Sequence, residues 1–276
     1  MLQPLSITDA TLPAGRNTRE AGQSRQRLRL LSYNIQTGIS SGHYRHYLTQ
    51  SWKHVLPFPQ RFENLDRIAR LIRSYDVVGL QELDTGSLRS GFVNLNQYLA
   101  ERGGFPFWYD QTNRRLGKIA RHATGMLSRI HPTAIQEHRL PGKIPGRGVL
   151  SVRFGTEREP LVLLIVHLAL GRRARMQQLA YISKLTERHE HVVLMGDLNC
   201  HSQSEEMEFL VQNTPVQEPV HGLNTFPSWR PQRNIDHILV SASLHVENVE
   251  VLHYPFSDHL PVAMEVTLPE SIQLAG

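Results

Sequence analysis

Side chains that can bind a metal ion or transfer a proton stand at the ends of several apolar runs in this chain. Asn34 ends the run LLSYN, Glu82 ends VVGLQE and His167 ends LLIVH. The run VVLMGDLN ends with Asp197 and Asn199. A single Asp or Asn in such a place is more often a turn residue or a helix cap. The repetition of the pattern therefore carries more weight than any one residue.

Two motifs near the C-terminus extend this set. Asp236 lies in NIDH, and Asp258 and His259 are adjacent in FSDHLPV, directly before another apolar run. Carboxylates, amides and histidines gathered at strand ends would be costly to bury without partners. A metal ion together with a substrate phosphate would satisfy them jointly.

The residue types favour a hard divalent cation. Mg²⁺ takes one or two carboxylates and keeps other oxygen ligands, and Glu82 and Asp258 suit that role; Mn²⁺ is an alternative. A thiolate-free set argues against structural zinc. His259 can act as an acid or a base, and a carboxylate such as Asp236 would fix its tautomer and raise its pKa.

Short runs rich in Val, Ile and Leu predict the strands that position these groups, and apolar residues at helical spacing predict helices between them. This alternation indicates an α/β layered domain. Ser202 and Glu205 have the spacing of a capping box before a further short helix through Phe209. The predicted strands are 28–35, 76–80, 161–166, 191–195, 235–240 and 261–266, and the predicted helices are 60–75 and 175–188.

The chain contains no long Pro/Gly/Ser linker and no internal repeat, so we predict one folded domain over residues 28–268. Residues 1–27 are polar and basic, which predicts a disordered N-terminal tail, and residues 269–276 are expected to form a C-terminal tail.

The composition is that of a globular protein with a formal net charge of +5 and a sequence pI near 9.5, which weakly favours polyanionic partners. Cys200 is the only cysteine, so an internal disulfide is excluded. No apolar leader or spanning-length apolar run is present, and we expect a cytoplasmic monomer without a transmembrane segment.

Six motifs in order resemble the endonuclease/exonuclease/phosphatase superfamily, whose deoxyribonuclease I-like fold is a four-layer α/β sandwich. In that fold two mixed β-sheets pack face to face with helices outside. The resemblance covers roughly residues 28–266, and small bacterial members are especially similar. The motifs are SYNIQ, LQE, HL, GDLN, DHI and SDHLPV.

This resemblance implies roles for the motif residues. Glu82 would bind Mg²⁺, and Asn34 and Asp258 would help to hold the metal site and the scissile phosphate. His259 is similar to the catalytic histidine of the family, with Asp236 orienting it.

The same resemblance implies that Asp197 and Asn199 position or deprotonate the attacking water, and that His167 stabilises the phosphate. Whether Asp197 or His259 is the general base stays open. The expected reaction is in-line attack of water on phosphorus, without a covalent intermediate, because no serine nucleophile stands out and Cys200 is better explained by packing.

Basic residues suggest where a polyanionic substrate would bind. Arg172, Arg173 and Arg175 follow the strand that bears His167, and a second basic stretch covers 114–122. Either could contact phosphates, as could Arg129, although a solvated helix face and a charged loop are about equally good explanations for the two stretches. The aromatic run 104–109 is better explained as a strand packed in the core than as a stacking surface.

The substrate is the least determined property. A phosphodiester in nucleic acid is favoured by the charge, so we expect a nuclease. A phospholipid phosphodiesterase, similar to sphingomyelinases or to proteins that remodel GPI-anchor lipids, is the alternative. A non-catalytic binding protein is disfavoured because none of the expected catalytic positions is replaced.

Overall fold

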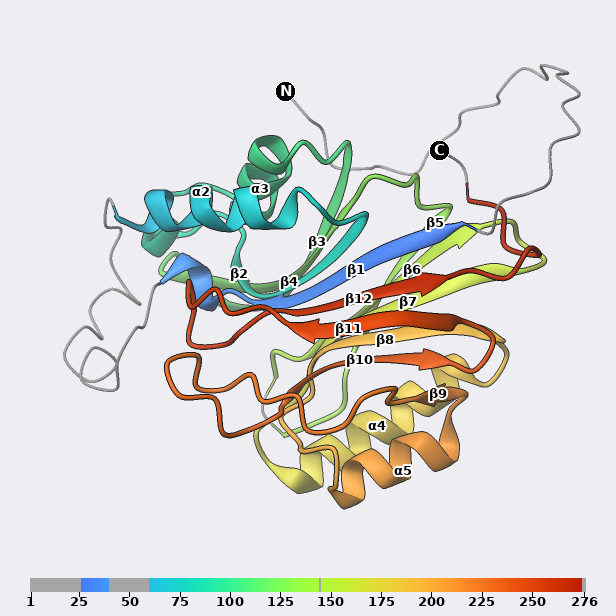
Figure 1. Cartoon of the computed structure of the whole chain (residues 1–276). Helices are drawn as coiled ribbons and strands as arrows, with labels where there is room; N and C mark the ends of the chain where they lie inside the picture. The colour runs from blue at the N-terminus through green and yellow to red at the C-terminus, as the bar shows by residue number, and fades with distance from the viewer. Residues whose placement is uncertain (1–25, 40–59, 144, 275–276) are drawn as a thin grey trace, which may run out of the picture.

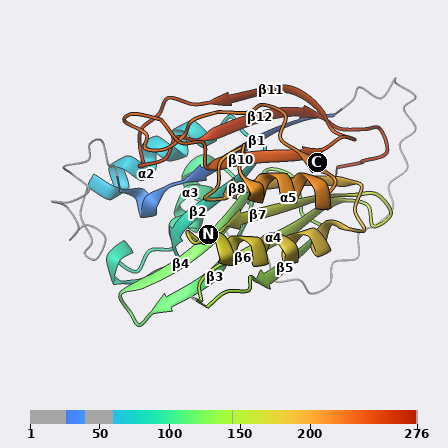
Figure 2. The same ribbon diagram turned by 90° about the horizontal axis from the view of Figure 1, so that it is seen from below.

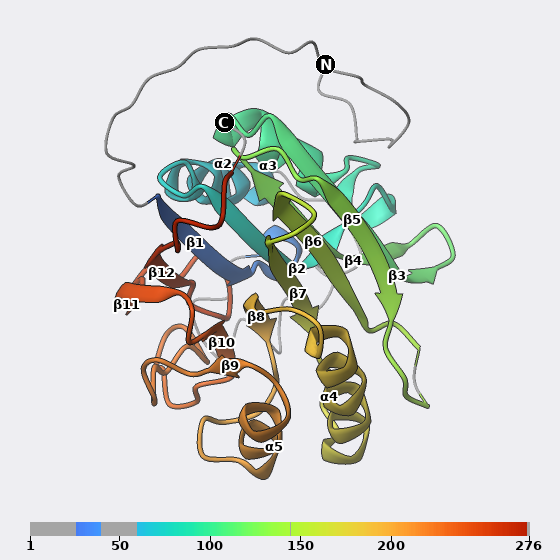
Figure 3. The same ribbon diagram turned by 90° about the vertical axis from the view of Figure 1, so that its right-hand side faces the viewer.

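The computed structural model describes residues 26–39, 60–143 and 145–274, and these form four layers (Figure 1). Two six-stranded mixed sheets pack face to face, with two helices on each outer side. Figure 3 shows α2 and α3 outside one sheet and α4 and α5 outside the other. The expected four-layer α/β sandwich is confirmed.

The first sheet has the strand order β11-β12-β1-β2-β4-β3. β1 and β2 are parallel and the other pairs are antiparallel. Its helices, α2 (Gln60–Ile72) and α3 (Leu95–Gly103), precede and follow β2 in the chain. The strands are β1 (Arg27–Asn34), β2 (Val77–Asp84), β3 (Phe107–Leu116), β4 (Ala120–Ser128), β11 (His245–Val251) and β12 (Val262–Thr267), and short 3₁₀ turns lie at η1 (Gln36–Gly38) and η3 (Leu88–Ser90).

The second sheet has the order β5-β6-β7-β8-β10-β9. Here β7 and β8 are the parallel pair, joined by α4 (Arg172–Thr186), so each sheet contains one βαβ crossover. Figure 2 shows α4 and α5 (Glu205–Asn213) lying across this sheet. The strands are β5 (Ala134–Arg139), β6 (Gly148–Gly155), β7 (Pro160–His167), β8 (His191–Asp197), β9 (Val216–Gln217) and β10 (Asp236–Ser241).

The main core lies between the sheets, where β-branched and long apolar side chains from both sheets interdigitate. The sheets approach closely at Gly79, where an added Cβ would lie 2.6 Å from the Met195 Cε atom. The segment predicted to be a C-terminal tail contributes Ile272 to this core.

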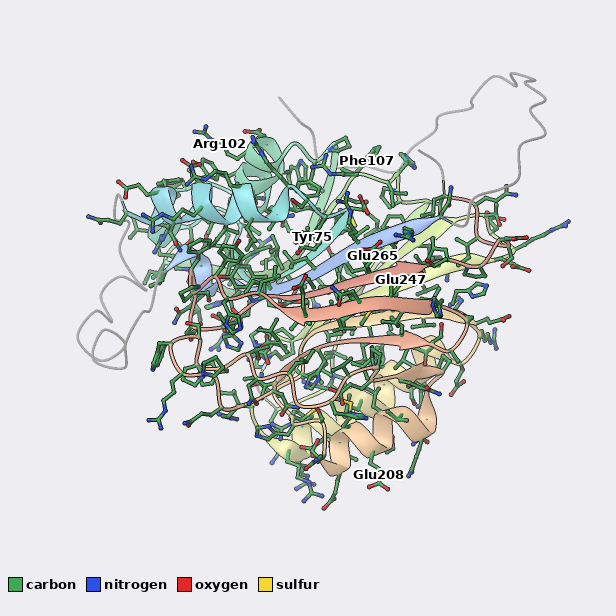
Figure 4. The ribbon with its side chains drawn as sticks, viewed as in Figure 1. Tyr75, Arg102, Phe107, Glu208, Glu247 and Glu265 are labelled. Atoms are coloured by element: carbon green, nitrogen blue, oxygen red, sulfur yellow. The ribbon has the colours of Figure 1, made fainter. Side chains whose placement is uncertain are left out.

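Each outer helix layer buries one apolar face. Leu65, Ile68 and Ile72 of α2 are buried against the first sheet, and Leu179 and Ile182 of α4 are buried against the second. Figure 4 shows Glu208 of α5 pointing away from the sheet, as expected for the polar side of an amphipathic helix.

The six predicted strands are present, with ends shifted by at most four residues. β4, β5, β6, β9, β11 and α3 were not predicted, and of β3 only the first residues were predicted, within the aromatic run 104–109. The predicted capping box is wrong, because the N-cap of α5 is Ser204, whose side chain accepts a hydrogen bond from the Met207 backbone N–H. Ser202 instead donates to Glu218.

The predicted N-terminal tail falls outside the described residues except for Gln26 and Arg27. Of the helices in the described part of the chain, none is both long and apolar enough to cross a bilayer.

Candidate active site

Strand register brings the motif residues to one end of the sandwich. In the first sheet Asn34 is level with Gln81, the residue before Glu82. In the second sheet Asp197 is level with both His167 on β7 and Asp236 on β10. The two βαβ crossovers therefore end at the same place, with their polar side chains facing one another.

Glu82 lies at a β-bulge within β2. The register of β2 with β4 shifts between Leu80 and Leu83, and Glu82 has φ of +56°. A positive φ is unfavourable for a glutamate, and such strain concentrates at functional sites. Asn199 has φ of +53°, so two of the predicted site residues carry this strain. Bulges re-aim a side chain.

The side chain of Asn34 joins the two halves of the site. Its Nδ2 atom donates to Glu82 Oε1 at 3.3 Å and to Asp197 Oδ2 at 3.2 Å. The side chain of Asn34 is buried, and its Oδ1 atom accepts from the Gln36 backbone N–H at 3.2 Å. The amide is thereby fixed as a donor towards two carboxylates.

His259 and Asp236 form a buried hydrogen-bonded pair. The distance from His259 Nδ1 to Asp236 Oδ2 is 2.8 Å, and the Thr225 hydroxyl also donates to that oxygen. Burial opposes charge on His259, but the attraction of Asp236 and the hydrogen bond outweigh it and raise the pKa of His259 to about 10. His259 is therefore a cation at neutral pH, with its Nε2–H group directed into the site.

Asp197 lies at the centre of the cluster, close to Asn34, His167 and His259. Its Oδ2 atom lies 4.0 Å from His259 Nε2 and 3.4 Å from His167 Nε2. Burial, followed by repulsion from Asp236, raises the pKa of Asp197 to about 7, although His259 opposes this shift. A carboxylate with that pKa can accept a proton near neutral pH. The Asn199 backbone N–H donates to its Oδ1 atom at 3.0 Å.

His167 is held by a residue that the sequence did not single out. Nη1 of Arg147 lies 3.1 Å from His167 Nδ1. A guanidinium can only donate, so Nδ1 must be the acceptor and the proton of the neutral ring lies on Nε2, facing Asp197. Burial, followed by repulsion from Arg147, lowers the pKa of His167 well below its usual value.

The sequence did not predict a role for Arg147, because its segment, LPGKIPGRG, indicates only a loop. The residue lies just before β6, and only the antiparallel pairing of β6 with β7 brings it beside His167. No local pattern in the sequence indicates this contact.

Asp258 lies at the same end of the sandwich, where Ser257 Oγ donates to its Oδ1 atom at 3.2 Å. Burial raises the pKa of Asp258 to about 6; nearby His259 lowers it and the Glu82 carboxylate raises it. Carboxylates that hinder one another's ionisation in this way are what a divalent cation relieves. The donor set therefore fits a metal.

Two sets of side chains could serve as ligands. Asp197, Asp236 and His259 bring ligand atoms within 4.8 Å of one another. His259, however, is cationic and bonded to Asp236 through Nδ1, and a metal ligand must be a neutral imidazole. The second set, Glu82 and Asp258, offers carboxylates without that conflict.

The predicted substrate-binding arginines have separate surroundings. Arg173 lines a cleft next to Glu82, whereas Arg172 forms an ion pair with Glu205 of α5. Arg175 does the same with Glu206, its Nη2 atom lying 2.7 Å from the carboxylate. Two of the three arginines in GRRAR therefore attach α4 to α5.

Arg129 lies at the opposite end of the first sheet. It follows β4 where Ser128 is level with Val77, the first residue of β2. Its guanidinium donates to four backbone carbonyl groups and stacks on Phe105. The structure does not bring Arg129 to the other candidate residues. The carbonyl acceptors are those of Arg73, Tyr75, Gly103 and Gly104.

A cleft of about 630 Å³ opens directly beside the cluster. Its walls come from the end of the β3–β4 hairpin, the loop before β6 and the first turns of α4, and Glu82 and His167 belong to both the cleft and the cluster. We call it the cation-lined cleft, because its lining includes Arg114, Lys143, Arg147 and Arg173.

Comparison with known proteins agrees with this arrangement. Residues 31–259 match the model of the Endonuclease/Exonuclease/phosphatase family. No curated protein sequence matches significantly. Many solved structures do match, all of those compared below at under 25% identity, a level that establishes the fold alone.

Three of these structures illustrate the range. An endonuclease/exonuclease/phosphatase from Beutenbergia cavernae has TM-score 0.69 and 20% identity, covering 88% of this chain and 72% of that one. A mannosyl-6-phosphatase from Bacteroides thetaiotaomicron has TM-score 0.65 and 18% identity, covering 87% and 100%. The human nocturnin catalytic domain, with a bound sulfate, has TM-score 0.65 and 16% identity, covering 92% and 100%.

The family model spans most of the chain, including every motif residue from Asn34 to His259. The chain is therefore a phosphoric ester hydrolase and belongs to the endonuclease/exonuclease/phosphatase family.

Proposed function

We propose that this protein is a Mg²⁺-dependent phosphodiesterase that cleaves nucleic acid by attack of water on phosphorus. The observation that supports a polyanionic substrate is the cation-lined cleft, which opens from the catalytic cluster and contains four cationic side chains and one carboxylate. Phosphate backbones bind to such surfaces chiefly through Lys and Arg.

The protein's own residues divide the chemistry between them. Asp197, with a pKa of about 7, accepts the proton of the attacking water, and the Asn199 backbone N–H orients that carboxylate. His259 stays protonated and neutralises charge that develops on the phosphoryl oxygens. His167 is neutral and donates through Nε2, which allows it to bind the same phosphate.

Glu82 and Asp258 would hold the metal ion, and Asn34 would orient the Glu82 carboxylate through its Nδ2–H group. The ion would supply further charge neutralisation at the phosphoryl oxygens. Mn²⁺ satisfies the same oxygen ligands. The raised pKa of His259, about 10, favours Asp197 as the base, because such a histidine already carries a proton at neutral pH.

A specific observation favours phospholipid as the second candidate substrate. Four exposed apolar side chains, Leu88, Phe92, Leu116 and Ile119, lie on η3, the residues after it and the β3–β4 turn. The backbone N–H of Leu88 bonds to the Lys118 carbonyl group at 2.8 Å, which joins these two segments. Exposed apolar and basic residues on these two adjoining segments suit the surface of an anionic membrane.

The test compares substrates at matched ionic strength. Purified protein with Mg²⁺ is assayed on plasmid DNA, RNA, and vesicles of sphingomyelin or phosphatidylinositol, with Glu82→Gln as the blank. We expect Glu82-dependent cleavage of DNA or RNA, abolished by EDTA and restored by Mg²⁺ or Mn²⁺. Head-group release without nucleic-acid cleavage would replace the proposal with the second candidate, and turnover in EDTA would reject the metal.

A further inference from the structure

The charges in the cation-lined cleft are poorly compensated. Its lining contains Arg114, Lys143, Arg147 and Arg173, and Glu82 is the only carboxylate among the lining residues that the structure describes. Its volume lies in the range of about 300–1,000 Å³ that is typical of small-molecule sites. The space is thus too large for a single phosphate group alone.

Three of these cations are available to a ligand. Arg114, Lys143 and Arg173 are exposed, and their side chains form no ion pair with any residue that the structure describes. By contrast, Arg172 and Arg175, on the same helical turn as Arg173, are paired with glutamates of α5. The fold compensates the arginines outside the cleft and leaves the one inside it unpaired.

The cations are held close together by the backbone. Gly146 has φ of +116°, and a Cβ added there would lie 2.9 Å from the Arg114 Cβ atom, so the loop before β6 passes directly against β3. Repulsion from Arg114 contributes to the lowered pKa of Arg147, after burial as the larger cause. A dianionic group between these side chains would relieve the repulsion.

The cleft also continues from the position of the reacting phosphate. Glu82 and His167 line its inner end and, through Asn34 and Asp197, belong to the catalytic cluster. A substrate bound at the cluster must extend one of its ester arms towards Arg114 and Arg173. The cations of the cleft would therefore contact this ester arm of the substrate and not the phosphate that is hydrolysed.

We propose that the cation-lined cleft binds a second phosphate group of the substrate, next along the strand to the phosphate that is hydrolysed. This inference rests on the proposed nucleic-acid phosphodiesterase function and specifies its substrate: a chain with at least two phosphates, of which one occupies the cleft while the other reacts. A diester that lacks the second phosphate is a poorer substrate by the loss of these contacts.

The first arm of the test is kinetic. Thymidylyl-thymidine, which has one phosphate, is compared with the same dinucleotide carrying a further phosphate at its 5′ or its 3′ end. We expect one of the two phosphorylated forms to have kcat/KM about tenfold higher than the parent. In the variant Arg114→Gln/Arg173→Gln the ratio of kcat/KM for that phosphorylated form to kcat/KM for the parent should fall below about threefold.

The matched control is Arg158→Gln/Arg188→Gln. Arg158 lies in the β6–β7 turn and Arg188 follows the C-terminal end of α4, so both are exposed and lie away from the cleft. This variant loses the same net charge, and it should keep the full tenfold gain. Equal losses in both double variants would show a general charge effect and overturn the inference.

The second arm measures binding without turnover. Calorimetry with Mg²⁺ present compares thymidine 3′,5′-bisphosphate, which contains no diester to cleave, with thymidine 5′-phosphate and thymidine 3′-phosphate. We expect the bisphosphate to bind about tenfold more tightly than either monophosphate, and to lose this advantage in Arg114→Gln/Arg173→Gln only. A bisphosphate that binds no more tightly than the monophosphates overturns the inference.

The two arms separate the two proposals. If no dinucleotide is cleaved in a Glu82-dependent way but the bisphosphate keeps its advantage, the second-phosphate site stands and nucleic acid is rejected as substrate. If dinucleotides are cleaved with no effect of a terminal phosphate, the phosphodiesterase function stands and the second-phosphate site is rejected.

Discussion

The catalytic cluster and the cation-lined cleft share Glu82 and His167 but are built on opposite principles. In the cluster the polar groups are buried and interlocked, with Asn34 bridging two carboxylates and Asp236 holding His259. In the cleft three of the four cations, Arg114, Lys143 and Arg173, are exposed and form no ion pair with any described residue. A buried polar side chain is costly without a hydrogen-bond partner, so the cluster side chains are tied to one another. Exposed side chains are hydrated, so the cleft cations can remain unpaired until a ligand binds.

Because of this difference, we expect mutations in the two regions to have different effects. A change in the cluster alters charges and hydrogen bonds that the reaction uses, so turnover should fall steeply. A change in the cleft should alter which substrate is preferred. The predictions below test that division, and they run from the largest expected effect to the smallest.

The largest effect is expected at the His259–Asp236 pair. His259→Ala and Asp236→Ala should each lower kcat by about 10²–10⁴-fold, because the cation at the phosphoryl oxygens is lost or misplaced. The double variant should be hardly worse than the worse single variant, since the two residues act as one unit. Steady-state kinetics on bis-p-nitrophenyl phosphate measure this. If the double variant instead lost kcat by the product of the two single losses, His259 and Asp236 would act independently, and the cluster would not be interlocked.

The next effect concerns Arg147, which belongs to both regions. Arg147→Met should lower kcat by about 10- to 100-fold, because His167 loses the donor that keeps its proton on Nε2. Nitrogen chemical shifts of the His167 ring should then show mixed tautomers. Arg147→Lys, which can still donate to Nδ1, should restore part of the activity. An unchanged tautomer with reduced kcat would mean that Arg147 acts only through its charge.

A smaller effect is expected at Arg129, which lies outside both regions. Arg129→Met should lower the free energy of unfolding by about 1–3 kcal/mol, because four backbone carbonyl groups lose their donor. Urea denaturation monitors this change. If KM for DNA rises while stability is unaffected, the residue contacts substrate, as the sequence first suggested, and the boundary of the cleft must be redrawn.

The smallest effect is a pH dependence of stability from His122 in the cleft wall. Burial, followed by repulsion from Arg89, lowers the pKa of His122 to about 4. Below pH 6.5 His122 is protonated in the unfolded chain, whereas in the folded protein it stays neutral until about pH 4. The free energy of unfolding therefore falls between pH 6.5 and pH 4. Relative to His122→Asn, the wild type should lose on the order of 1–2 kcal/mol over that range, after allowance for partial exposure of the ring. Parallel stability curves for the two proteins would contradict the lowered pKa.

The fold was predictable where strands form uninterrupted apolar runs. β7 and β8 are nearly continuous apolar runs, and each was predicted to within a few residues. β5 and β11 were missed because their side chains are largely exposed at sheet edges, which gives polar sequences without an apolar run. β6 is buried, but Ser151 and Arg153 interrupt its apolar pattern.

By itself, the sequence determined the chemical types at the strand ends. Asn34, Asp197 and His259 lie in short contiguous motifs, so their nature and order can be read directly from the chain. The same motifs determined the family and therefore the four-layer fold, which the structure confirms.

Only the tertiary structure decided how those groups are aimed and what surrounds them. The bulge at Glu82, the contact of Arg147 with His167 and the pairing of Arg172 but not Arg173 all depend on segments distant in the chain. Local periodicity reflects burial of one element against its neighbours, so it encodes strands and helices. Local periodicity does not indicate which loops meet across the end of the sandwich. Those contacts are made by single side chains, and strand register sets their partners.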